Sequence, residues 1–128
     1  MRKANTTVKG DDTMDKDLAL TKALAYTEEV CKILSPQMII LYGSYADGTA
    51  TADSDIDIAI IFNNYNGDWL QDSKVLWKLT RKISTNIEPI LLDRTKDPSG
   101  FVDRICTFGE TLYTEDKHFQ PKADTSSA

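Results

Sequence analysis

Two short motifs in this sequence have the residue types and spacing to bind phosphate and a metal ion. Gly43 and Ser44 end one apolar run, and after ten intervening residues Asp55 and Asp57 open another. Side chains two residues apart in a strand point to the same side, so we expect both carboxylates on one face of a sheet. Two adjacent carboxylates repel unless a cation lies between them. Mg²⁺ is the natural ion, because it is usually held by one or two carboxylates together with substrate phosphates.

The glycine and the serine predict the other half of such a site. Glycine lets a backbone approach a ligand closely and adopt dihedral angles that other residues avoid. The backbone N–H groups of such a turn attract anions, and the Ser44 hydroxyl can donate to a phosphate oxygen. Taken singly, each motif is common in plain turns and polar strand ends. Together, between two buried-strand patterns, they predict a triphosphate and its metal ions held across adjacent strand ends.

The apolar pattern around the motifs predicts interleaved helices and strands. Helical spacing marks residues 15–34, 68–84 and 99–106, and short apolar runs predict strands at 38–42, 56–62, 87–92 and 111–113. The polar residues 44–54 are expected to be irregular. Pro89 removes a backbone donor, which predicts an edge position or an irregularity for the third strand. These elements indicate an α/β or α+β domain, with helices packed on a small mixed sheet.

Size, charge and composition limit the classes of function. The 128 residues fit one domain at 15–114, with polar, disordered segments at 1–14 and 115–128. The net charge of −5 disfavours a long nucleic acid as substrate. No apolar run approaches the roughly 20 residues of a membrane span, and the N-terminus lacks the apolar core of a signal peptide. Cys31 and Cys106 lack the spacing of a zinc or disulfide framework. We therefore expect a cytoplasmic protein without a membrane segment.

The two motifs belong to a longer pattern that resembles a known family. Residues 41–48 (LYGSYADG) and 53–58 (DSDIDI) look like the minimal nucleotidyltransferases, which are small stand-alone members of the DNA polymerase beta-like nucleotidyltransferase superfamily. The resemblance covers roughly Asp15 to Tyr113 and implies the polymerase beta-like fold. It implies that Gly43 and Ser44 bind the nucleotide. One position departs: the family usually has a basic residue before the second glycine of the loop, and here that residue is Asp47.

The resemblance also implies a third carboxylate from a neighbouring strand. Glu88 is our candidate, because an ionisable residue inside an apolar strand is expected to face a site or solvent. Asp93, at the end of the same strand, is the alternative, and Glu88 could instead be a plain solvent-facing edge residue. In the family the catalytic and metal-binding acids, here Asp55, Asp57 and Glu88, hold two Mg²⁺ ions, with Mn²⁺ as a substitute. The third acid also helps to activate the acceptor hydroxyl.

The implied activity is metal-dependent, adenylyltransferase-like transfer of a nucleoside monophosphate from ATP or another nucleoside triphosphate to an acceptor hydroxyl. We expect the acceptor pocket to come from a second chain, since the sequence lacks a large extra domain. In the family, stand-alone members act as antitoxins beside HEPN-domain ribonuclease toxins, and some add adenylate to a tyrosine of the toxin. One alternative is a small-molecule, aminoglycoside-like nucleotidyltransferase that works as a homo-oligomer. The other is a non-catalytic module that only binds its partner.

A group of basic residues allows two interpretations. Lys74, Lys78 and Lys82 recur at four-residue spacing beside Arg81, opposite the apolar stripe of their predicted helix. A solvated helix face explains them, and a contact surface for an acidic partner is the sharper alternative.

Overall fold

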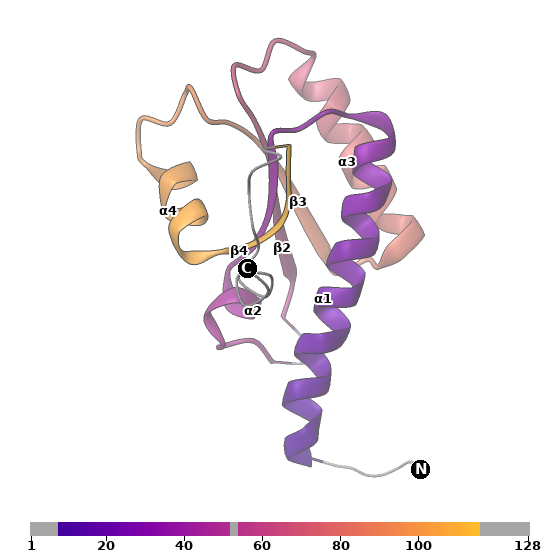
Figure 1. The fold of residues 1–128 in the computed structure, drawn as a ribbon. Coiled ribbons are helices and arrows are strands. Elements are labelled where there is room, and N and C mark those ends of the chain that lie inside the picture. The colour runs from indigo at the N-terminus through magenta and orange to yellow at the C-terminus, as the bar shows by residue number, and fades with distance from the viewer. Residues whose placement is uncertain (1–7, 52–53, 116–128) are drawn as a thin grey trace, which may run out of the picture.

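A four-stranded mixed sheet forms the centre of the molecule, with the strand order β3-β2-β1-β4 (Figure 1). The structure is a computed structural model that describes residues 8–51 and 54–115. The strands are β1 (Met38–Tyr42), β2 (Ile56–Phe62), β3 (Ile87–Asp93) and β4 (Glu110–Thr114), and the helices are α1 (Val8–Ile33), α2 (Ser44–Asp47), α3 (Trp69–Ile83) and α4 (Phe101–Phe108). β1 runs antiparallel to β2 and β4, whereas β2 and β3 are parallel. The predicted class, helices packed on a small mixed sheet, is confirmed.

Helices cover both faces of this sheet. α1 and α3 lie on one side and α4 on the other (Figure 1). The core on the first side includes Tyr26 and Val30 of α1, Leu76 of α3, and Ile58 and Ile60 of β2. The core under α4 contains Val102 and Ile105 with Ile40, Ala59 and Ile61. β2 is therefore buried on both faces, which explains why its sequence is almost continuously apolar.

The strong local patterns located the central elements well. β1 and β2 have the predicted bounds, and β3 is an edge strand, as Pro89 indicated. α3 begins after Asp68, whose side chain caps the helix by accepting the N–H of Gln71 at 3.1 Å. Cys31 and Cys106 are free thiols. No helix among the described residues is long and apolar enough to cross a membrane.

Two local expectations were wrong. α1 begins at Val8, so residues 8–14, which we expected to be disordered, continue the helix. Residues 8–14 are mostly polar. The apolar period from which we predicted the helix begins only after residue 15. The second error is α2, which lies inside the loop predicted to be irregular; a single turn is too short to show a helical period. The predicted disorder at 1–7 and 116–128 concerns residues outside those that the structure describes.

Candidate active site

Side chains from three neighbouring strands form a row at one end of the sheet. Asp57 on β2 is the register partner of both Tyr42 on β1 and Glu88 on β3. Directly opposite residues project on the same face of a sheet, here the face covered by α4, because Tyr42 packs with the α4 core. Asp55 precedes Asp57 by two residues, at the entrance to β2. We call Asp55, Asp57 and Glu88 the acid row.

Two carboxyl groups of the acid row, those of Asp57 and Glu88, have raised pKa values. A hydrogen bond with Asp55 is the main cause that raises the pKa of Glu88, followed by burial and by the charges of Asp55 and Asp57. The pKa of Asp57 is raised by burial and then by the charge of Asp55. Burial, together with the charges of Asp57 and Glu88, raises the pKa of Tyr42 to about 12. The structure therefore concentrates negative charge that a bound cation would relieve.

Gly43 brings the Gly-Ser turn, which the sequence predicts to bind phosphate, into contact with the acid row. Its backbone has φ 76° and ψ −150°, a region that only glycine adopts readily. A Cβ atom at this position would collide with the Oδ2 atom of Asp57. The backbone of Gly43 therefore lies against a carboxylate of the acid row, and the two motifs of the sequence meet in one site.

The one-turn helix α2 fixes the chain after Gly43. The Gly43 carbonyl accepts the N–H groups of Ala46 and Asp47, both at 3.1 Å. Gly48 ends the turn in the left-handed conformation, with φ 84°. The carbonyl of Ser44 then accepts the N–H of Thr49 at 3.0 Å. These bonds hold the half-buried Ser44 next to the glycine that contacts Asp57.

Asn86 holds the chain on both sides of Asp55. Its side-chain Nδ2 donates to the carbonyl of Ser54 at 3.4 Å, and its own carbonyl accepts the N–H of Ile56 at 2.8 Å. The Ser84 hydroxyl is hydrogen-bonded to the Asn86 side chain in turn. Sequence reasoning missed this residue. A polar residue in front of an apolar run is an ordinary strand boundary, and no local pattern connects it to Asp55.

Comparisons with known proteins decide the family. Residues 25–118, more than half of the chain, match the family model described as polymerase beta, nucleotidyltransferase. The chain belongs to this nucleotidyltransferase family. The match confirms the resemblance seen in residues 41–48 and 53–58, and the mixed sheet agrees with the polymerase beta-like fold. A search of curated proteins found no significant match.

Two solved structures resemble this nucleotidyltransferase domain. One is the crystal structure of a nucleotidyltransferase candidate from Sulfolobus solfataricus, 24% identical, with a TM-score of 0.64 over 94% of this chain and 97% of that one. The other is a toxin–antitoxin crystal structure with AMP-PNP, 24% identical, with a TM-score of 0.55 over 77% of this chain and 75% of that one. At this identity the likeness concerns the fold.

The alternative third acid, Asp93, lies too far away to join the acid row. Asp93 and Glu88 are five residues apart on β3, which corresponds to roughly 16 Å along a strand. The Asp93 carboxylate accepts the N–H of Tyr65 at 2.9 Å and the Thr95 hydroxyl at 2.6 Å. The hydrogen bond from Thr95 is the main cause that lowers the pKa of Asp93. Asp93 thus stabilises turns at the opposite end of the strand, and Glu88 is the acid that the fold brings to Asp57.

A pocket of about 400 Å³ lies beside the acid row, between α2 and α4. Gly43 and Asp47 line one side of it and Arg104 of α4 another. The Asp47 carboxylate accepts the N–H of Thr49 at 3.0 Å and its hydroxyl at 2.6 Å, which lowers the pKa of Asp47. Sequence reasoning missed Arg104, because only the packing of α4 on the sheet brings it near the loop.

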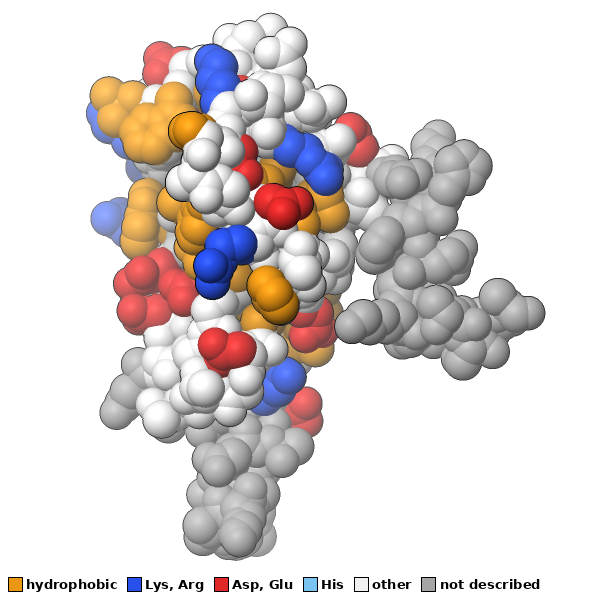
Figure 2. Space-filling model, turned by 90° about the vertical axis from the view of Figure 1, so that its left-hand side faces the viewer, with side chains coloured by type: hydrophobic (Ala, Val, Ile, Leu, Met, Phe, Trp, Pro, Cys, Tyr) orange, Lys and Arg blue, Asp and Glu red, His pale blue; other side chains and the backbone are white. Residues whose placement is uncertain are grey.

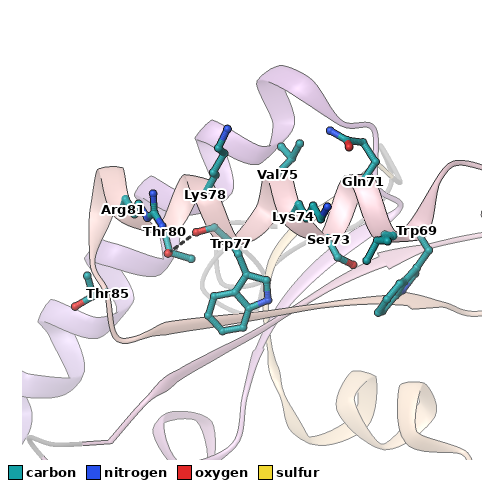
Figure 3. A pocket seen from close by; sticks show the side chains of 11 residues that line it. Trp69, Gln71, Ser73, Lys74, Val75, Trp77, Lys78, Thr80, Arg81 and Thr85 are labelled. Atoms are coloured by element: carbon teal, nitrogen blue, oxygen red, sulfur yellow. Dashed lines mark hydrogen bonds between the residues drawn. The ribbon is translucent and has the colours of Figure 1, made fainter.

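A larger pocket, of about 780 Å³, lies along α3 and contains no acidic residue among those described (Figure 3). Lys74, Lys78 and Arg81 border it together with Trp69 and Trp77, and both indoles are about half exposed. The basic side chains are exposed, as predicted for a solvated helix face. Since α3 lies across the sheet from the acid row, this pocket is separate from the site that we describe.

The donor set of the acid row suits a hard divalent cation. Carboxylate oxygens are the ligands that Mg²⁺ and Mn²⁺ take up, and the strand register puts Glu88 directly beside Asp57, with Asp55 two residues away. Among the side chains that the structure describes, no three histidine, cysteine or acidic residues form a ready-made metal cage. Mg²⁺ needs no such cage, because substrate phosphates and water normally supply its remaining ligands.

Proposed function

We propose that this domain transfers a nucleoside monophosphate from ATP, or another nucleoside triphosphate, to an acceptor hydroxyl. The acceptor that we propose is a tyrosine of a HEPN-type toxin, which makes the protein an antitoxin. The contact between the Gly43 backbone and the Asp57 carboxylate carries the proposal. It puts the turn suited to phosphates and the acids suited to metal ions within a single site.

Mg²⁺, with Mn²⁺ as a substitute, is the cofactor that we propose. Asp55, Asp57 and Glu88 would hold two ions together with the phosphates of the nucleotide. When bound, these ions stabilise the charge on the attacking and leaving oxygens of the phosphoryl group. Gly43 and Ser44 would orient the phosphates through backbone N–H groups and the serine hydroxyl.

The transfer itself is a single displacement at the α-phosphorus. A bond forms between the acceptor oxygen and the α-phosphorus, while the bond from that phosphorus to the oxygen bridging to the β-phosphate breaks. Pyrophosphate leaves with that electron pair, and the hydroxyl proton passes to a base. Glu88 is the residue that we propose for this proton, because its exposed carboxylate lies next to Asp57 at the end of the sheet, where an acceptor hydroxyl can approach. The remaining contribution of the domain is positioning.

Three observations support a protein partner as acceptor. The toxin–antitoxin structure with AMP-PNP shares this fold. The net charge of −5 suits a protein acceptor better than a nucleic acid. The row of Asp57 and Glu88 lies at an end of the sheet, and Glu88 is exposed, so a tyrosine from another chain can approach it.

Intact-mass spectrometry tests the proposal. The protein is incubated with ATP, Mg²⁺ and a helical HEPN-type partner carrying an Arg-x4-His motif, encoded beside its gene. The partner should gain the mass of one or more adenylates. Addition of EDTA, or the variant Asp57→Asn, should prevent the gain, whereas Lys96→Ala, in the turn at the other end of β3, should leave it unchanged.

Two results would contradict the proposed acceptor. An unmodified partner, combined with nucleotidylation of an aminoglycoside or another small molecule, would establish the small-molecule enzyme, acting alone or as a homo-oligomer. Tight binding of the partner without any transfer, and without binding of ATP in the presence of Mg²⁺, would establish a non-catalytic module.

A further inference from the structure

We propose that Arg104 binds the terminal phosphates of the nucleoside triphosphate, in the pocket between α2 and α4. This inference rests on the proposed function and identifies a phosphate subsite outside the Gly-Ser turn. It also accounts for the acidic residue at position 47. The positive charge that this loop lacks would come from a helix on the other side of the pocket.

The pocket continues directly from the acid row. Gly43 lines the pocket with its backbone and also lies against the carboxylate of Asp57. Tyr42 lines it too, and Tyr42 is the register partner of Asp57 on the neighbouring strand. A nucleotide whose α-phosphate lies at the acid row can therefore extend its remaining phosphates past Gly43 into this space.

Arg104 is the basic residue that this pocket offers to a phosphate. Among the described residues that line the pocket it is the only one with a positive charge, and it has no ion-pair partner in the described part of the chain. No ion pair joins Asp47 to Arg104 among the described residues, because the Asp47 carboxylate is turned to Thr49 and accepts its N–H and its hydroxyl. A guanidinium group binds phosphate through two parallel hydrogen bonds.

The fold holds the backbone of Arg104 firmly in place. The N–H of Arg104 donates to the carbonyl of Gly100 at 3.0 Å, and the carboxylate of Asp97 caps the helix by accepting the N–H of Val102 at 3.0 Å. The ring of Phe101, one turn earlier, meets Tyr42 edge-on at 6.0 Å between centroids. α4 is thereby packed against the strand that leads into Gly43, so the backbone of Arg104 lies on the side of the pocket opposite the loop.

The side of the molecule that carries α4 exposes hydrophobic side chains next to charged ones (Figure 2). Phe108, which also lines the pocket, is 72% exposed. An aromatic ring at the rim could stack on a nucleobase, which would place the base in the pocket and the phosphates elsewhere. We assign the phosphates to the pocket because a guanidinium without an ion-pair partner among the described residues lines it, and the experiment separates the two arrangements.

Calorimetry with ATP, ADP and AMP in the presence of Mg²⁺ tests the assignment. Removing a charge-assisted contact to phosphate should weaken binding of ATP about 10- to 100-fold in Arg104→Ala. The affinity for AMP should change less than about twofold, since AMP lacks the terminal phosphates. Arg104→Lys, which keeps the charge but loses the paired hydrogen bonds, should fall between wild type and Arg104→Ala. The matched control Arg81→Ala removes the same side chain from α3 and should bind ATP like wild type.

The outcomes distinguish this inference from the proposed function. Equal losses for ATP and AMP in Arg104→Ala would overturn the assignment and place the base or the ribose in the pocket. Unchanged ATP affinity in Arg104→Ala, with binding lost in Asp57→Asn, would overturn the role of Arg104 and leave the proposed function standing. A wild-type protein that binds no nucleotide would overturn both. Circular dichroism of Arg104→Ala checks that the exposed substitution leaves the fold intact.

Discussion

Substitution of Gly43 by alanine tests whether the two sequence motifs form one site. The methyl group would force an L-residue into a backbone region that costs about 1–3 kcal/mol, and it would also collide with the Asp57 carboxylate. Gly48→Ala is the matched control, because Gly48 also has a positive φ, of 84°, but a methyl group added there would meet no atom of the described residues within 4 Å. The control should cost roughly 1–2 kcal/mol, from the left-handed conformation alone.

The contact with Asp57 can be separated from backbone strain by a double-mutant cycle. In the Asp57→Ala background the collision is removed, so Gly43→Ala should cost only the strain. The coupling free energy between the two substitutions should therefore be about 0.5–3 kcal/mol, as found for residues in contact. The Asp57 carboxylate is only half-buried and can turn away from the methyl group. The further the Asp57 carboxylate turns away, the closer the coupling free energy comes to the lower limit of this range. The same movement takes the Asp57 carboxylate out of the acid row.

Two measurements follow these effects. Urea unfolding, monitored by circular dichroism and by Trp69 and Trp77 fluorescence, gives the free energies of unfolding for the four proteins of the cycle. Calorimetry gives the affinity for ATP in the presence of Mg²⁺, which should fall at least tenfold in Gly43→Ala and stay near wild type in Gly48→Ala. Additive free energies in the cycle, together with unchanged nucleotide affinity in Gly43→Ala, would refute the claim that the turn and the acid row are one site.

Three further predictions concern single residues. Tyr26→Phe should lower the free energy of unfolding by about 1 kcal/mol in urea titrations, because the buried Tyr26 hydroxyl donates to the Leu76 carbonyl at 2.7 Å; an unchanged midpoint would contradict this. Asp57→Asn should raise the melting temperature in metal-free buffer, since it removes a half-buried charge from the acid row, and a lower melting temperature would show that the charge is already compensated. Asp47→Arg should tighten ATP binding by up to about 1–3 kcal/mol, the range for a charge-assisted contact, if position 47 faces the phosphates. Unchanged affinity in calorimetry would mean that position 47 does not face the phosphates.

The parts of the fold that depend on residues close together in the sequence could be predicted from the sequence. Continuous apolar runs located β1 and β2 to the residue, and Pro89 placed β3 at an edge, because a missing backbone donor is a local property. The beginning of α1 and the single turn of α2 could not be predicted in this way. Neither stretch has the apolar period on which the helical pattern depends.

The sequence by itself determined which residues have the types and spacing for chemistry: the spacing of Gly43 and Asp57 predicts a phosphate turn beside a metal-binding pair. Only the tertiary structure decided how close these residues are and which others join them. The parallel pairing of β2 with β3 makes Glu88 the neighbour of Asp57, and the packing of α4 on the sheet brings Arg104 to the loop. Strand order, register and helix packing depend on contacts between residues far apart in the chain. Local spacing and periodicity do not encode these contacts, and only the folded chain reveals them.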